Sequence, residues 1–142
     1  MRRIKRKQSV TYSNGGYMSI FVGRCESRLS LLKYIKCDHG AFRDGFMSTE
    51  LGDDFGIDYL HDDYLVIDVK DKACSDVDEL FGEAAIFKME DLKEVIGSSL
   101  DEKYNCVIIL GGVKYDGKIK EVNNKSFGYY KFLCTLPGVF YI

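Results

Sequence analysis

The longest apolar run in the chain, Cys106 to Leu110, is the feature that most constrains its fold. The run extends with few interruptions to Val113, far short of the roughly 20 residues that a membrane-spanning helix needs. A strand that is apolar at consecutive positions is usually covered on both faces of its sheet. The sequence therefore predicts that residues 106–113 form a central strand with other elements packed on both sides.

Three more segments have the β-branched and aromatic composition of strands, at residues 18–23, 64–70 and 129–134. A Tyr-Asp-Gly-Lys sequence at 115–118 is typical of a hairpin turn. The strand at 129–134 is therefore expected to pair with the central one.

Polar caps followed by apolar residues at helical spacing predict four short helices. Ser27 precedes the first, at 28–36, in which Leu29, Leu32 and Ile35 form the apolar stripe. The other three are a short helix after Ser48 that ends at Gly56, a helix after Ser75 with Val77, Leu80 and Phe81 inside, and a helix at 89–96 closed by Gly97.

No break in composition divides residues 18–142. We expect them to form a single α+β domain with a mostly antiparallel sheet and a few short helices. Residues 39–46 contain two glycines and are expected to be a loop.

The segment before this domain, residues 1–17, holds five of the 20 basic residues and no acidic one. It is expected to be a disordered basic leader. A second interpretation concerns the gene. The codons for Asn14 to Tyr17 accommodate GGAGG, a bacterial ribosome-binding site, a few bases before the ATG of Met18. Translation would then start at Met18, and the leader would not be translated.

The five cysteines are widely spaced, odd in number and include no C-x-x-C pair, and the two histidines fall in no zinc spacing. We therefore expect neither a disulfide framework nor a zinc site. Cys106 and Cys134 lie within apolar segments and are expected to be small core residues. Reduced thiols are typical of cytoplasmic proteins, so that compartment is expected.

Charge is distributed unevenly along the chain. Fourteen of the 22 acidic residues, but only three of the 20 basic ones, lie between Glu50 and Asp91. We call this segment the acidic block. Its field repels nucleic acid and anionic lipid and attracts a basic partner. The alternative interpretation is that the block is only a solvated acidic face.

No constellation of residues indicates catalysis. No local signature places His39 or His61 beside a cysteine, and Gly111-Gly112 is not followed by a helix start that would hold a phosphate. The segment 53–58 lacks the alternating acidic positions and the final glutamate of a calcium loop, although a weak cation site there stays open. We expect no cofactor, no metal and no enzymatic activity.

One stretch of the chain resembles a known family. Its residues are Ser48 and Leu51, then Asp53-Asp54-Phe55-Gly56-Ile57, Tyr59 and Asp62-Asp63-Tyr64-Leu65. They are similar to the immunity protein 22 family of bacterial polymorphic toxin systems. The strand at 104–110 and the aromatic end at 127–141 are similar too, so the resemblance covers roughly residues 18–142. The chain departs from the family in having no tryptophan and in its adjacent Asp62 and Asp63.

The resemblance implies a cytoplasmic, non-catalytic inhibitor that binds a cognate toxin, such as a nuclease or another basic effector, and blocks it. The acidic block independently favours such a partner, because charge complementarity speeds association and selects the partner. Five carboxylates are expected to supply charge and two tyrosines to supply buried contact area: Asp53, Asp54, Asp58, Asp62, Asp63, Tyr59 and Tyr64. Reversing Asp53, Asp54, Asp62 and Asp63 to lysine is expected to abolish binding and leave the fold intact.

Two other functions stay open. The first is a small accessory or regulatory module with a different protein partner, which would use the same acidic residues. The second is an enzyme of unrecognised type, which would have a cleft with converging polar side chains. A neighbouring gene that encodes a large toxin would favour the immunity function. Tyr64 also has an alternative role, as a core residue of its strand.

Overall fold

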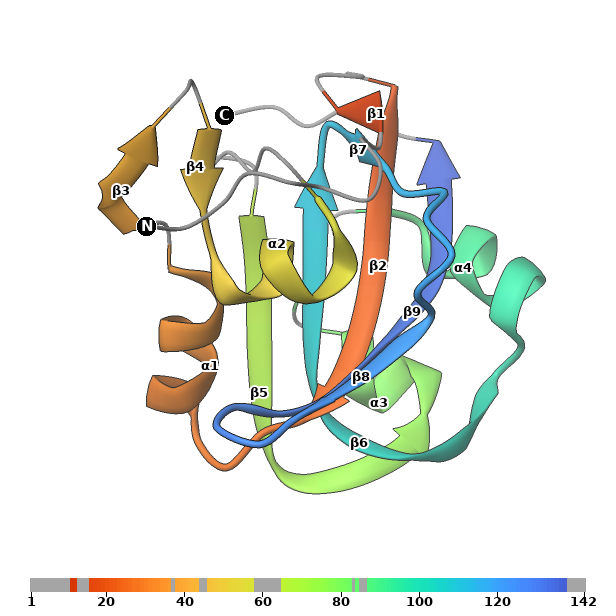
Figure 1. Cartoon of the computed structure of the whole chain (residues 1–142). Coiled ribbons are helices and arrows are strands. Elements are labelled where there is room, and N and C mark those ends of the chain that lie inside the picture. The colour runs from red at the N-terminus through yellow and green to blue at the C-terminus, as the bar shows by residue number, and fades with distance from the viewer. Residues whose placement is uncertain are drawn as a thin grey trace.

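The structure, a computed structural model, describes residues 11–12, 16–36, 38–43, 46–57, 65–82, 84 and 87–137. Its centre is a five-stranded antiparallel sheet in the order β5-β6-β2-β9-β8 (Figure 1). The strands are β2 (Tyr17–Arg24), β5 (Leu65–Asp76), β6 (Ser99–Gly111), β8 (Glu121–Asn124) and β9 (Gly128–Pro137). The helices within these ranges are α1 (Arg28–Ile35), α2 (Glu50–Phe55), α3 (Val77–Phe81) and α4 (Met89–Ile96). The predicted single α+β domain with a mostly antiparallel sheet is confirmed.

Two small sheets accompany the large one. Strand β1 (Thr11–Tyr12) pairs with β7 (Val113–Lys114), and β3 (Asp38–Arg43) pairs with β4 (Phe46–Ser48). The prediction of a loop at 39–46 is therefore wrong. The two glycines lower the strand propensity of this segment. The two strands are nevertheless stabilised by pairing with each other, and composition alone does not indicate such pairing.

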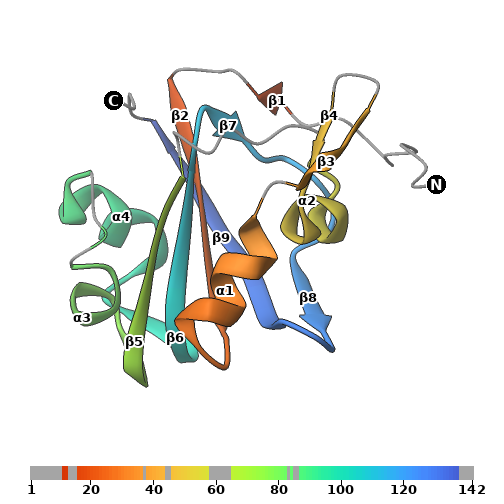
Figure 2. The ribbon, with the colours of Figure 1, turned by 90° about the vertical axis from the view of Figure 1, so that its left-hand side faces the viewer.

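The sheet separates two hydrophobic cores because successive side chains of a strand point to opposite faces. On β6, Cys106 and Ile108 join the core under α1 and α2, while Val107 and Ile109 join the core under α3 and α4. Figure 2 shows the two pairs of helices on either side of the sheet. The predicted double coverage of this apolar run is confirmed.

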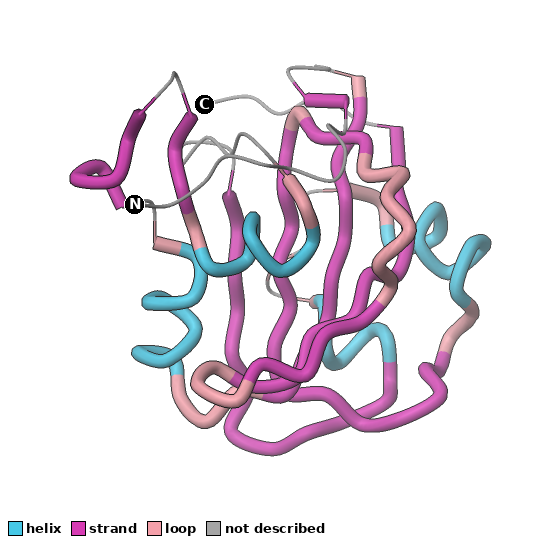
Figure 3. The backbone as a smooth tube through the Cα atoms, viewed as in Figure 1, coloured by secondary structure: helices cyan, strands magenta, loops and turns pink. Residues whose placement is uncertain are grey.

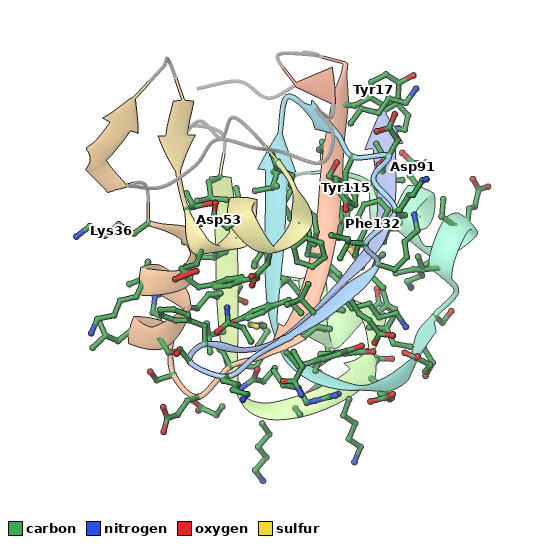
Figure 4. The ribbon with its side chains drawn as sticks, in the orientation of Figure 1. Tyr17, Lys36, Asp53, Asp91, Tyr115 and Phe132 are labelled. Carbon is green, nitrogen blue, oxygen red and sulfur yellow. The ribbon has the colours of Figure 1, made fainter. Side chains whose placement is uncertain are left out.

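The predicted hairpin between the central strand and residues 129–134 is wrong. Strand β6 pairs with β2 and β5, whereas β9 pairs with β2 and β8. Tyr115 is buried at the supposed turn, where its backbone N–H donates to Ser19 Oγ (2.9 Å) and its hydroxyl donates to the Ile119 carbonyl (2.8 Å). Its ring packs edge-on against Phe132 at 4.9 Å between centroids, and Figure 4 shows the two side chains together. This buried tyrosine anchors a crossing to the far edge of the sheet.

The helices begin and end close to the predicted residues, and they are short beside the strands (Figure 3). Ser27 caps α1 by accepting from the N–H of Ser30, and α4 spans residues 89–96 as predicted. Two caps lie one residue later than predicted, at Thr49 for α2 and Asp76 for α3. Each accepts a backbone N–H three residues on, as N-caps do.

The buried side of α1 differs from the predicted stripe. Leu31, Tyr34 and Ile35 are buried, whereas Leu29 is 62% exposed and Leu32 is 43% exposed. The ring of Tyr34 stacks on that of Tyr130 with centroids 4.2 Å apart and planes 10° apart. This stack fixes the rotation of the helix, and Leu31 follows because it lies one turn before Tyr34 on the same side.

The four cysteines that the structure describes are free thiols, and Cys106 and Cys134 are buried as predicted. Within the described ranges, no helix has the length and apolarity required to cross a membrane.

Replacing Gly23 with alanine is expected to destabilise the sheet by about 1–3 kcal/mol, the usual cost of overpacking. A Cβ there would lie 2.4 Å from Tyr130 Cδ1 and 2.5 Å from the Tyr129 carbonyl oxygen, so β2 and β9 would have to separate. Urea denaturation of Gly23→Ala measures the change. A variant as stable as the parent would show that the strands admit the methyl group freely.

Candidate functional site

Of the seven residues predicted to bind a partner, the structure places two. Asp53 and Asp54 lie on α2 and are both half-buried. The other five lie outside the described residues: Asp58, Tyr59, Asp62, Asp63 and Tyr64.

Asp54 holds three elements together. Its Oδ2 accepts a hydrogen bond from the Tyr34 hydroxyl at 2.7 Å and another from the Asn124 side-chain amide at 2.9 Å. Tyr34 belongs to α1, Asp54 to α2 and Asn124 to β8. Burial, followed by the hydrogen bond to Asp54, raises the pKa of Tyr34, so the hydroxyl remains a donor across the ordinary pH range.

Asp54 is therefore not a freely exposed charge, and the contacts argue against the expectation that its reversal to lysine leaves the fold intact. Hydrogen bonds to a charged group contribute about 1.5–3 kcal/mol each, so this carboxylate stabilises the fold. No local pattern indicates this contact, since Tyr34 and Asn124 are 20 and 70 residues away from Asp54 along the chain.

The acidic block does not form one continuous surface in the described part of the chain. Helix α2 packs on one face of the sheet through Leu51 and Phe55, and α3 packs on the other through Leu80 and Phe81. Figure 4 accordingly shows Asp53 on α2 far from Asp91 on the opposite side of the molecule. The carboxylates of the block must therefore be considered as two separate groups.

The larger group in the described residues lies on α3, α4 and the residue before α3. It has five exposed carboxylates of the block, and Glu94, which follows the block on α4, is a sixth. We call these six residues the acidic face: Asp76, Asp78, Glu79, Glu90, Asp91 and Glu94. Two lysines accompany them, of which Lys93 is already paired with Asp78 at 2.5 Å. The acidic face therefore has a strong excess of negative charge.

Some of these carboxylates also stabilise the short helices that carry them. Asp76 caps α3 by accepting from the Glu79 N–H at 2.9 Å. Carboxylates in the first turn of a helix are favoured by its dipole, and Asp78, Glu79, Glu90 and Asp91 occupy such positions. Stabilisation of the helix N-termini therefore explains most carboxylates of the acidic face. It does not explain Glu94, which lies in the last turn of α4.

Three glutamates of the acidic face are available to a partner. Glu79, Glu90 and Glu94 are exposed, and their carboxylates form no hydrogen bond or ion pair with another described residue. Beside them on α4, Val95 is 57% exposed. The face thus offers unpaired negative charge next to apolar area, a combination that suits a basic protein surface.

Two other described carboxylates of the block are less suited to docking beside the acidic face. Asp68 on β5 is half-buried and pairs with Lys70 at 3.0 Å, and Glu50 begins α2 on the opposite side of the sheet. Among the residues that the structure describes, no three histidine, cysteine or acidic side chains lie close enough together to hold a metal ion.

Comparison with known proteins gives no relative: no protein-family model, no curated protein and no solved structure matches this chain.

Proposed function

We propose that the chain is an immunity protein that binds a cognate bacterial toxin and neutralises it without catalysis. The observation that supports this most is the acidic face on α3 and α4, where Glu79, Glu90 and Glu94 are exposed and unpaired within the described residues. The resemblance of residues 48–65 to the immunity protein 22 family, although no family model matches the chain, implies the same function.

The chemistry of the acidic face favours a basic partner. Repulsion between neighbouring carboxylates on α3 and α4 is relieved when cationic side chains approach, and opposite charge also steers the encounter. A toxin that acts on nucleic acid carries such cations in its substrate groove. An acidic inhibitor that occupies the groove would block the substrate by taking the place of its phosphates.

The acidic face and the residues predicted at 58–64 are two alternative positions for the docking surface. We favour α3 and α4, because Glu79, Glu90 and Glu94 are exposed and unpaired within the described residues, whereas Asp54 is hydrogen-bonded to Tyr34 and Asn124. Val95 would supply apolar contact area at the centre of the interface, and the carboxylates around it would form the polar rim.

Co-expression with the product of the neighbouring gene tests the proposal. If that gene encodes a toxin domain, bacteria that express the domain alone should stop growing, and co-expression of this chain should restore growth. The two proteins should also co-purify. Growth arrest that this chain does not relieve would contradict the immunity function. Co-purification without relief would instead indicate an accessory protein.

A further inference from the structure

Large apolar side chains are exposed at three positions in the described residues, and all three lie on two helices. Leu29 and Leu32 belong to α1, and Val95 belongs to α4. A single exposed leucine needs no explanation. Two exposed leucines on one helix, however, form a small apolar patch that a partner molecule could cover.

The exposed leucines of α1 lie among cations. Residues three or four apart share one side of a helix, so Arg28, Leu32 and Lys36 follow one another, as do Leu29 and Lys33. The three basic residues are exposed and form no ion pair with a described residue. Figure 4 shows Lys36 directed away from the body of the protein. The outer side of α1 is therefore apolar and basic.

The outer side of α4 has the opposite charge. Asp91 lies one turn before Val95, Glu94 lies next to it, and Glu90 lies one turn before Glu94. Of the two lysines at α4, Lys93 is paired with Asp78, and Lys88 is the exposed N-cap residue, so the three carboxylates stay in excess. Both helices have eight residues, which makes each roughly 12 Å long. The two outer surfaces therefore match in size and are complementary in charge.

We propose that, when no toxin covers α4, α1 of one molecule docks on α4 of a second copy of this chain. Leu29 and Leu32 would pack against Val95, while the cations of α1 would lie beside Glu90, Asp91 and Glu94. The two helices cover opposite faces of the sheet and lie at opposite sides of the molecule in Figure 1. The contact is therefore heterologous, and each molecule keeps a free α1 at one end and a free α4 at the other.

This interface is small, and we expect it to form only at high protein concentration. Interfaces below about 1,200 Å² are typically weak and transient. A Kd near 1 mM is the expected scale, so the measurement must reach about 1 mM protein. Added salt should weaken the association further, because it screens exposed charges.

Two variants test the contact, each altered on one helix only. Leu29→Gln with Leu32→Gln removes the apolar patch of α1, and Glu94→Gln with Val95→Gln alters the matching part of α4. Glutamine is a good helix former and adds no new charge. All four positions are exposed, so the melting temperatures should not change. Lys118→Gln with Lys125→Gln, also at exposed positions, is the matched control.

Sedimentation equilibrium of the full chain should show the average mass rising with concentration, for the parent and the control alike. Each helix variant alone should associate about tenfold or more weakly. An equimolar mixture of the two variants should form a 1:1 pair and nothing larger, because each supplies the surface that the other lacks.

Three results would overturn the proposal. One is a parent chain that remains a monomer up to about 1 mM, the expected Kd. Another is undiminished self-association in either variant, which would place the interface elsewhere. The third is a mixture that does not pair although the α1 variant is monomeric, which would indicate contact between two copies of α1.

Discussion

Replacing Asp54 with lysine is expected to destabilise the fold by about 3–5 kcal/mol, a large part of the stability of a small domain. The substitution removes the acceptor of the Tyr34 hydroxyl and of the Asn124 amide. It also places a cation beside the buried ring of Tyr34, whose hydroxyl is then left without its acceptor. Urea denaturation followed by circular dichroism measures the loss.

Glu50→Lys is the matched control for this prediction. Glu50 lies on the same helix and is exposed. Its reversal removes a favourable interaction with the helix dipole and should cost no more than about 1 kcal/mol. Equal losses for the two variants would show that the contact between Asp54, Tyr34 and Asn124 does not stabilise the fold. The expected difference also means that lost toxin binding in an Asp54 variant would report unfolding and not docking.

Reversing Glu79, Glu90 and Glu94 to lysine is expected to weaken toxin binding by on the order of 100-fold or more while the domain stays folded. Close charge pairs across an interface couple by about 1.5–7 kcal/mol, and 1.4 kcal/mol corresponds to a factor of ten in Kd. The three side chains are exposed, so most of the effect should fall on binding. The Kd is measured by titration calorimetry against the purified toxin domain.

The control for this second prediction carries three reversals outside the acidic face, at Asp58, Asp62 and Asp63. Both variants change the formal net charge by the same amount, so a difference between them reports the position of the interface and not the total charge. We expect only the variant with Glu79, Glu90 and Glu94 reversed to lose toxin binding. The opposite result would move the docking surface to residues 58–64, which contain five of the seven residues predicted from the sequence.

Much of the local structure is predictable from neighbouring residues. Ser27 and the glycines at 56 and 97 mark the ends of helices because a cap satisfies backbone groups within one turn. The apolar run at Cys106 to Leu110 predicts burial on both faces because no side of it is polar. These patterns involve residues that are close together along the chain, so they can be recognised from the sequence alone.

Contacts between distant residues could not be predicted in this way. The stripe of Leu29, Leu32 and Ile35 has helical spacing, yet the stacking of Tyr34 on Tyr130, which is 96 positions further along the chain, turns two of those leucines outward. Strand β9 likewise pairs with β2 and not with β6, because the chain crosses the sheet after β6 and Tyr115 anchors that crossing. Periodicity indicates that a helix has an apolar side, but packing decides which side is buried.

The division of the acidic block has the same kind of cause. Strand β5 lies between α2 and α3 along the chain, and the two helices that it connects pack on opposite faces of the sheet. Carboxylates that are close in sequence are thereby separated in space. The charge of the block was evident from composition, whereas its distribution over two surfaces follows only from the topology.

Titration calorimetry of the wild-type chain against the toxin domain that we expect from the neighbouring gene, at low and at high salt, decides whether the chain is an inhibitor that binds through charge. We expect a 1:1 complex whose Kd rises with salt, because charges on the surface are screened over roughly 8–10 Å at physiological ionic strength. The toxin should also lose its activity in the complex. No binding, or binding that leaves the toxin active and does not respond to salt, would show that the chain is not such an inhibitor.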